Sequence, residues 1–216
     1  MNVKLKHLCL LCFLIPVMTV IGSFIWSANL NLISWCIPNI EGCTSISRAG
    51  RYEPVKYFFK TMMFIYAVIL YFFWNNFYDF LIQNRINLSK FSLLLAYSSI
   101  FFLILYIIFL GEGKFYKFFR QVGIFIYIFF TIIVQLFFSF KFKKLYSINL
   151  ITRNILFYYS FIITILGLML FPLVISEIKI ISNFKNIVSW NYFFLIQIYF
   201  LILFKIMKNL GNPTTP

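Results

Sequence analysis

The sequence predicts an all-α polytopic membrane protein, a bundle of six transmembrane helices with one long non-cytoplasmic loop between the first two. Of its 216 residues, 62% are hydrophobic and 11% are charged, whereas soluble domains carry roughly 25% charged residues. The mean hydropathy is +0.93. A water-exposed globule of this composition would show large apolar patches, which soluble proteins rarely do. The apolar residues also gather in six uninterrupted blocks, and a helix of about 20 such residues crosses the hydrocarbon core of a bilayer.

The six blocks form a single membrane domain over residues 1–216. They are continuous runs without the polar alternation of a membrane β-barrel, so we expect helices. The blocks cover residues 8–28, 57–81, 91–110, 121–140, 154–176 and 187–204, and the long loop covers residues 29–56.

The first block follows a basic N-terminal segment with Lys4 and Lys6, as a signal peptide does. Its apolar run of about 20 residues is longer than the 7–15 residues of a cleaved signal. We therefore expect this block to be retained as the first membrane span.

Basic residues predict the orientation, because cytoplasmic loops carry an excess of Lys and Arg. Ten such residues fall on the side of the two termini and nine on the opposite side. Without the charges of the long loop, the balance favours cytoplasmic termini. The densest basic cluster lies on the same side, and it consists of Lys141, Lys143, Lys144 and Arg153. We therefore predict a multi-pass protein with both termini in the cytoplasm.

The net charge of +14 needs no nucleic-acid partner. Lys and Arg at helix ends reach towards headgroups and attract anionic lipid. In residues 115–120 basic and aromatic side chains alternate, as they do in an interfacial belt. We expect membrane lipids, anionic ones above all, as partners, and the sequence identifies no protein partner.

Catalytic and metal-binding patterns are missing from the sequence. The one histidine, His7, precedes the first span and has no acidic neighbour, whereas a Ser-His-Asp triad or a zinc site of the His-Glu-x-x-His type needs a histidine within the fold. The sequence contains neither Gly-x-x-x-x-Gly-Lys-Ser/Thr nor Gly-x-Gly-x-x-Gly. We therefore predict no catalytic residue, no metal ligand and no cofactor.

Four polar side chains fall within or near the spans. Asn75 and Asp79 share one helix face at a spacing of four. An ionisable group inside a membrane is a functional hypothesis by default, but the second span is about to leave the bilayer here. An interfacial cap, or a contact of Asp79 with Arg85, explains this residue equally well. Gln135 and Gln197 are more central, and hydrogen bonding between helices is their simplest role.

The loop over residues 29–56 is the longest connection, and long loops in compact folds are commonly functional. Cys36 and Cys43 flank a segment with proline and glycine, whose turn could bring the two thiols together in a disulfide if the loop is extracytoplasmic. Gly50 and Pro54 predict a defined turn packed over the bundle, with Gly50 at a positive φ. The alternative is a solvated connector.

The same loop carries a short motif made of Ile46, Ser47, Gly50 and Pro54, with Glu53 beside the proline. In this motif, and in its layout of one span, a long loop and five closely spaced spans, the chain resembles the DRAM/Frag/Sfk family. That family includes the damage-regulated autophagy modulators and the Golgi factor that remodels the lipid of GPI anchors.

The chain departs from the family pattern, which reads Pro-x-Ile-Ser-Asp-Thr-Gly, at Thr44, Arg48 and Ala49. Arg120 stands where the family's fourth span often opens with a histidine, and Gly123 follows it. The resemblance implies the fold and a membrane setting. The missing Asp and His remove acid–base groups, so the resemblance does not favour an enzyme.

The function that we predict is recognition of lipid or glycolipid headgroups at the outer face by a non-enzymatic or accessory membrane protein. Arginine suits bidentate contacts with phosphate. The candidate ligand-binding residues are Ser47, Arg48, Gly50, Arg51, Glu53, Glu112 and Arg120.

Two alternatives stay open. A membrane-embedded enzyme of lipid acyl or headgroup transfer would use Glu53 or Glu112 as a general base. A small transporter would need intramembrane polar groups or repeat symmetry. The two halves show no clear repeat, and the polar candidates reduce to Asn75, Asp79, Gln135 and Gln197.

Overall fold

The computed structural model describes the chain except for residues 1, 112, 146–149, 176–181 and 212–216. The described residues form helices and connections without a strand, which confirms the all-α fold. Six helices are long and apolar enough to cross a membrane. They are α1 (Asn2–Asn29), α4 (Val55–Gln83), α5 (Lys90–Ile108), α6 (Lys114–Phe142), α7 (Leu150–Ile175) and α8 (Ser182–Gly211).

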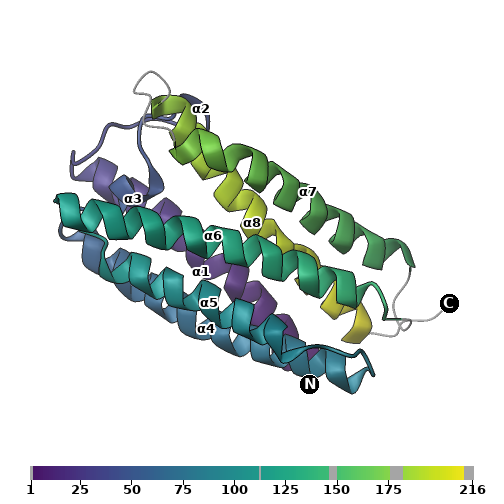
Figure 1. Ribbon diagram of the computed structural model, residues 1–216. Helices are drawn as coiled ribbons and strands as arrows, with labels where there is room; N and C mark the ends of the chain where they lie inside the picture. The colour runs from purple at the N-terminus through teal and green to yellow at the C-terminus, as the bar shows by residue number, and fades with distance from the viewer. Residues whose placement is uncertain (1, 112, 146–149, 176–181, 212–216) are drawn as a thin grey trace.

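The six long helices lie side by side as a bundle (Figure 1). Each packs against its neighbours along the chain, from α1 through α4, α5, α6 and α7 to α8, and α8 packs against α1. The bundle is therefore a closed ring in chain order. Apart from the long loop between α1 and α4, the connections between consecutive long helices are short, and short connections favour antiparallel neighbours.

Aromatic side chains fill the centre of the ring. Trp74 of α4 meets Phe138 of α6 with ring centroids 5.1 Å apart, and Phe73 of α4 meets Phe200 of α8 at the same separation. All four side chains are fully buried. Large rings suit this place because they reach across the centre of the ring, between helices that are not neighbours in it.

Most of the long helices extend beyond the predicted apolar blocks. α6 begins at Lys114 rather than at residue 121, and α4 ends at Gln83 rather than at residue 81. Polar residues at a membrane interface continue the helix because their side chains reach the headgroups while the backbone stays hydrogen-bonded. At one end the helix is shorter, since α5 ends at Ile108 rather than at residue 110. The predicted end of the fifth block, residue 176, lies outside the described residues.

The long loop is a packed structure at the end of the bundle opposite the N-terminus, which we call the loop end (Figure 1). It contains two single-turn helices, α2 (Pro38–Glu41) and α3 (Ile46–Ala49). A disulfide joins Cys36 to Cys43 around α2. The loop is thus folded back on itself, as a turn packed over the bundle requires.

Hydrogen bonds fix the loop to the N-terminal part of α8. Asn186 Nδ2 donates to the Gly42 carbonyl at 2.8 Å, and the indole of Trp190 donates to the Thr44 carbonyl at 2.9 Å. On the other side Ser27 of α1 donates to the Ala49 carbonyl at 2.6 Å. These bonds satisfy backbone groups that helices this short cannot satisfy internally. The loop is therefore no solvated connector.

Candidate anion site at the loop end

The segment that carries the predicted motif turns at the end of α3. Ser45 caps this helix by accepting a hydrogen bond from the Arg48 amide at 3.3 Å, and Gly50 ends it. The prediction of a positive φ at Gly50 is wrong, because its φ is −97°. Any residue adopts that backbone conformation. Glycine is needed for space instead, since a Cβ atom at this position would overlap the buried ring of Phe59.

The turn brings two arginines from distant parts of the chain together. Arg51 follows α3, and Arg120 lies near the start of α6. Their guanidinium groups are near enough to interact electrostatically with each other, and both interact with Tyr106 of α5. The sequence separates the arginines by more than a whole transmembrane hairpin, so only the closure of the bundle explains their proximity.

Neither arginine has a carboxylate partner among the described residues. Arg120 is 7% exposed and donates from Nη1 to the Gly111 carbonyl at 2.6 Å. Arg51 lies over the Tyr52 ring, with 5.5 Å from Cζ to the ring centroid, and its buried Nε has no hydrogen-bond partner. Like charges brought together at low exposure repel each other. The pair therefore provides an electropositive site with one hydrogen-bond donor unused.

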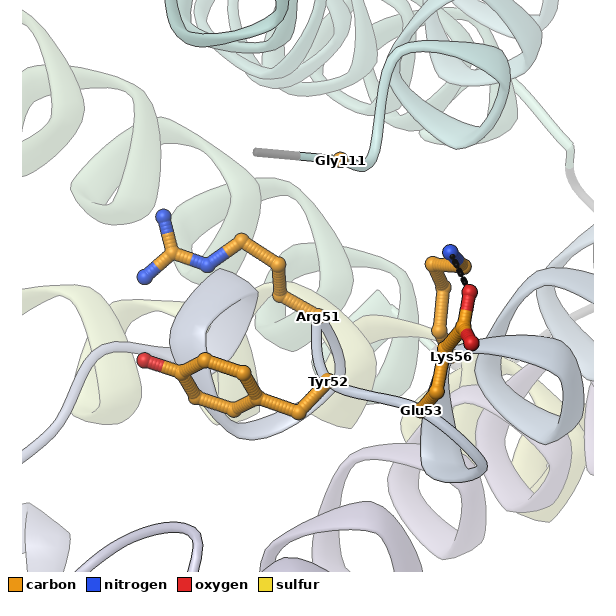
Figure 2. Close-up of a pocket in the computed structure, with 5 residues that line it drawn as sticks. All are labelled: Arg51, Tyr52, Glu53, Lys56 and Gly111. Atoms are coloured by element: carbon orange, nitrogen blue, oxygen red, sulfur yellow. Dashed lines mark hydrogen bonds and ion pairs between the residues drawn. The ribbon is translucent and has the colours of Figure 1, made fainter. Parts of the chain in front are cut away.

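An open cleft of about 310 Å³ reaches Arg51 of this pair, whereas Arg120 is not among its lining residues. The cleft is lined by Arg51, Tyr52, Glu53, Lys56 and Gly111. In Figure 2 the Arg51 guanidinium points away from the Glu53 carboxylate, and Gly111 faces both from the α5–α6 connection. The cleft therefore combines a cationic side with a neutralised side, where Lys56 Nζ donates to Glu53 Oε1 at 2.5 Å.

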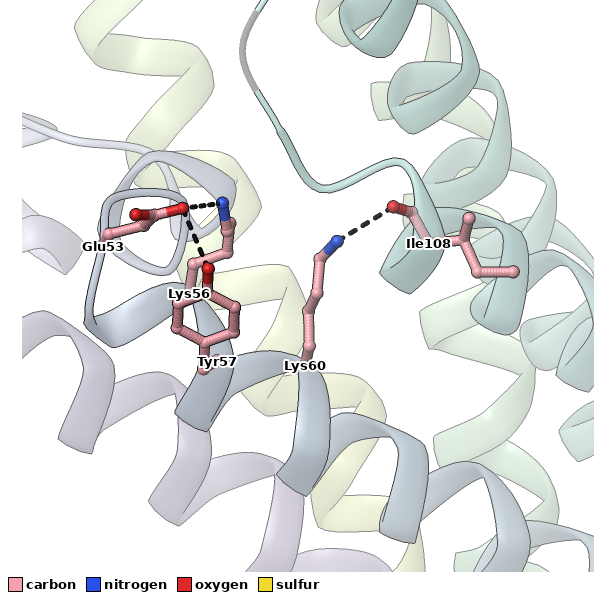
Figure 3. Close-up of polar contacts among 5 residues, drawn as sticks. All are labelled: Glu53, Lys56, Tyr57, Lys60 and Ile108. Carbon is pink, nitrogen blue, oxygen red and sulfur yellow. Dashed lines mark hydrogen bonds and ion pairs between the residues drawn. The ribbon is translucent and has the colours of Figure 1, made fainter.

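Glu53 is held as a carboxylate and is poorly suited to act as a base. The same oxygen, Oε1, accepts hydrogen bonds from Lys56 and, at 3.2 Å, from the Tyr57 hydroxyl (Figure 3). These two bonds lower the pKa of Glu53 below its ordinary value. A lower pKa makes a weaker base, so the geometry does not favour Glu53 as the general base of an enzyme. Nearby, Lys60 is engaged with the end of α5, where its Nζ donates to the Ile108 carbonyl at 3.0 Å.

The structure brings together only part of the predicted site. Ser47 and Arg48 do not line the cleft; Arg48 is exposed, and the Ser47 hydroxyl lies 3.5 Å from that of Ser45. Glu112 lies outside the described residues. Sequence reasoning missed Gly111, for which no local signal exists. It also missed Lys56, which pairs with Glu53 across the start of α4, and whose spacing of three from that acid is a usable signal.

The intramembrane polar residues have partners of different kinds. Asn75 donates to the Tyr71 carbonyl at 2.8 Å and accepts from the Tyr97 hydroxyl of α5 at 2.7 Å. Asp79 is exposed and makes no ion pair with Arg85. The proposed contact between those two residues is therefore wrong, because Asp79 faces outward near the end of α4.

Gln135 and Gln197 lie in the interior of the bundle, each 1% exposed. Gln135 Nε2 donates to the Ile196 carbonyl of α8 at 3.2 Å, which is the hydrogen bonding between helices that its central position predicts.

Six apolar helices and a packed loop define the class of this chain as a multi-pass integral membrane protein. Comparison of the chain with family models, curated proteins and solved structures finds no match. The resemblance to the DRAM/Frag/Sfk family therefore stays a prediction, and the site must be interpreted from its own chemistry.

Proposed function

We propose that this membrane protein, acting without catalysis of its own, binds the phosphate-bearing headgroup of an anionic lipid at the loop end. The observation that carries the proposal is the Arg51–Arg120 pair, which has no carboxylate partner among the described residues and of which Arg51 lines the open cleft. A phosphate accepts charge-assisted hydrogen bonds from guanidinium groups and relieves their mutual repulsion.

The position of the site favours a lipid over a free anion. Arg51 lies just before α4, and Tyr106 lies two residues before the end of α5, so both are at the level where helices leave the apolar core. Aromatic side chains surround this end of α6, with exposed fractions of 62% for Phe115 and Phe118 and 44% for Tyr116. Exposed aromatic rings at a helix end are typical of the headgroup region.

The disulfide supports an orientation with the loop end outside the cytoplasm, since disulfides persist in oxidising compartments. Both termini would then be cytoplasmic. A thiol-reactive, membrane-impermeant reagent tests this in intact cells with Ile40→Cys, whose native side chain is 70% exposed, and Ser89→Cys, between α4 and α5. Only the Ile40→Cys variant is expected to react from outside, because the two other thiols, at Cys9 and Cys12, are buried. Reaction of Ser89→Cys from outside would invert the orientation.

The binding proposal is tested by native mass spectrometry of lipid retained from nanodiscs of phosphatidylcholine and phosphatidylglycerol in equal amounts. Arg51→Ala is expected to lose retained phosphatidylglycerol. Arg48→Ala is the matched control, because it removes the same charge from the same loop outside the cleft. Equal retention of phosphatidylglycerol in the two variants would contradict the proposal, because retention would then depend only on the net charge of the loop.

Two further measurements distinguish a lipid phosphate from a free phosphate ion and from the Glu112 carboxylate as the anion bound at this site. Inorganic phosphate added in excess is expected not to displace the lipid, because the lipid is also held by its contact with the bilayer. Displacement would indicate a site for free phosphate. Glu112→Gln is expected to leave retention unchanged, whereas a rise in retention would show that this carboxylate, rather than a lipid phosphate, occupies the site.

A further inference from the structure

The densest basic cluster of the sequence lies at the end of the bundle opposite the loop end, where α6 ends and α7 begins (Figure 1). Two of its four members fix connections between helices. Lys141 Nζ donates to a backbone carbonyl of the α4–α5 connection at 3.2 Å, and Arg153 Nη1 donates to a backbone carbonyl of the α6–α7 connection at 2.7 Å. Lys143 and Lys144 have a different environment.

The ammonium groups of Lys143 and Lys144 lie over aromatic rings. Lys143 Nζ is 5.0 Å from the ring centroid of Phe157 and 5.7 Å from that of Tyr158, both on α7. Lys144 Nζ is 5.8 Å from the ring centroid of Phe140 on α6. A ring face attracts a cation within about 6 Å. Because the rings of Phe140 and Phe157 are 6.1 Å apart, the two ammonium groups are held over neighbouring rings.

No carboxylate neutralises these two charges within the described part of the chain, where the one ion pair joins Lys56 to Glu53. The sequence between residues 113 and 176, which covers α6 and α7, contains no acidic residue. An ammonium group has three hydrogen-bond donors, whereas the contacts of Lys143 and Lys144 with described residues are with ring faces. Their donors therefore stay available to an anion from outside the chain.

An exposed apolar surface continues from these rings along the bundle. The ring of Phe157 stacks on that of Phe161, one helical turn further along α7, with centroids 6.1 Å apart. Phe140 is 48% and Phe161 44% exposed, and both belong to helices that are long and apolar enough to cross a membrane. We call Phe140, Phe157 and Phe161 the aromatic strip. Its exposed faces are in contact with lipid chains.

The two lysines and the aromatic strip match the two parts of an anionic phospholipid. The phosphate of the headgroup accepts charge-assisted hydrogen bonds from ammonium groups. The acyl chains extend from the headgroup in the same direction as the strip extends from the lysines. An anion in solution, or an acidic segment of another protein, would meet only the lysines and leave the strip unused.

We infer that Lys143, Lys144 and the aromatic strip form a binding site for an anionic phospholipid of the leaflet opposite the loop end. The rings hold the two ammonium groups at the edge of the surface that faces lipid, so the headgroup and the chains of one molecule are bound together. The inference does not rest on the arginine pair of the loop end, which lies at the other end of the bundle.

Photocrosslinking in nanodiscs tests this inference. Two probes carry the same diazirine-bearing acyl chain and differ only in their headgroups, phosphatidylglycerol and phosphatidylcholine. Mass spectrometry of the crosslinked peptides measures labelling of the segment that contains Phe157 and Phe161, which is separate from the loop end. In the wild-type protein we expect the phosphatidylglycerol probe to label this segment several-fold more than the phosphatidylcholine probe. Equal labelling by the two probes would overturn the inference.

The double variant Lys143→Gln with Lys144→Gln keeps two polar side chains but removes both charges. It is expected to label equally with the two probes, because the headgroup then has no cationic partner on the rings. A preference for phosphatidylglycerol that persists in this variant would contradict the assignment of these two lysines.

The matched control is Lys205→Gln with Lys208→Gln, which removes the same charge from two exposed lysines of α8 at the same end of the bundle. Lys144 and Lys205 lie five and six residues beyond the hydrogen bond between Ser139 of α6 and Tyr199 of α8, so they are at a similar level. The control is expected to keep the wild-type preference. An equal loss in the two double variants would overturn the inference, because labelling would then depend only on the charge of this end.

An excess of inorganic phosphate separates a lipid from a free anion. We expect it to change the labelling no more than chloride does at the same ionic strength, since a free phosphate cannot use the aromatic strip. A loss of the phosphatidylglycerol preference with phosphate but not with chloride would indicate a site for a soluble anion and contradict the inference.

Discussion

Gly50 connects the packing of the loop to the position of Arg51, so Gly50→Ala tests how the loop end is built. An added Cβ atom would overlap the ring of Phe59. That ring is 1% exposed and packs edge-on against Tyr106, with centroids 6.3 Å apart, so it has little room to move. The displacement must therefore reach either the loop or Tyr106, and both neighbour the arginine pair.

The size of the effect follows from two opposing contributions. Overpacking a close-packed site costs about 1–3 kcal/mol of unfolding free energy. Replacing glycine by alanine where the backbone already suits alanine recovers about 0.4–1 kcal/mol through the unfolded state. The φ of −97° at Gly50 is such a conformation. We expect a net destabilisation of about 0.5–2 kcal/mol.

Gly22→Ala is the matched control within α1. A Cβ atom there would lie 3.6 Å from the Phe58 ring, which is an ordinary contact. Alanine favours a helix interior over glycine by about 0.5–1 kcal/mol, so this variant is expected to stabilise the protein. Equilibrium unfolding in mixed detergent micelles measures both changes.

Gly50→Ala and Gly22→Ala are thus expected to change the unfolding free energy in opposite directions. If Gly50→Ala is neutral or stabilising, steric exclusion by Phe59 is not the reason for glycine at this position. The double variant Gly50→Ala with Phe59→Leu gives a further check, because a smaller side chain is expected to relieve most of the penalty. Additive effects of the two substitutions would contradict a direct contact.

Two further predictions concern the same loop. Replacing both Cys36 and Cys43 by serine is expected to destabilise the protein by about 2.5 kcal/mol, because the disulfide closes a loop between cysteines seven residues apart and so lowers the entropy of the unfolded chain. The loss of the disulfide is also expected to raise the rate of proteolysis at α2. An unchanged proteolytic pattern would contradict this prediction. Because the pKa of Glu53 is lowered in the folded state, its stabilising contribution is present above the ordinary value of 4.5 and is lost as the pH falls through the folded value. The difference in stability between wild type and Glu53→Gln is expected to be small, because Glu53 is exposed, and to shrink below pH 4.5. A difference that grows on acidification would be inconsistent with the bonds from Lys56 and Tyr57.

Much of the fold was accessible from the sequence because a membrane leaves a chain few choices. Backbone groups inside hydrocarbon must be paired within a helix, so an uninterrupted apolar block of sufficient length determines a spanning helix whatever its neighbours are. All six predicted blocks correspond to such helices. The ends were less predictable, since residues such as Lys114 and Gln83 continue a helix although they are polar.

The sites depended on tertiary structure. Nothing local to Arg51 or Arg120 indicates that they share an end of the bundle, and nothing local to Lys143 indicates that its ammonium group lies over a ring of α7. Gly50 shows the same limit, because its sequence context suggested an unusual φ whereas the decisive factor is the ring of Phe59. The sequence by itself determined which segments enter the membrane, since transfer of a segment depends on its own composition. Which side chains meet was decided only by the packing of the helices, because those contacts join residues from different helices.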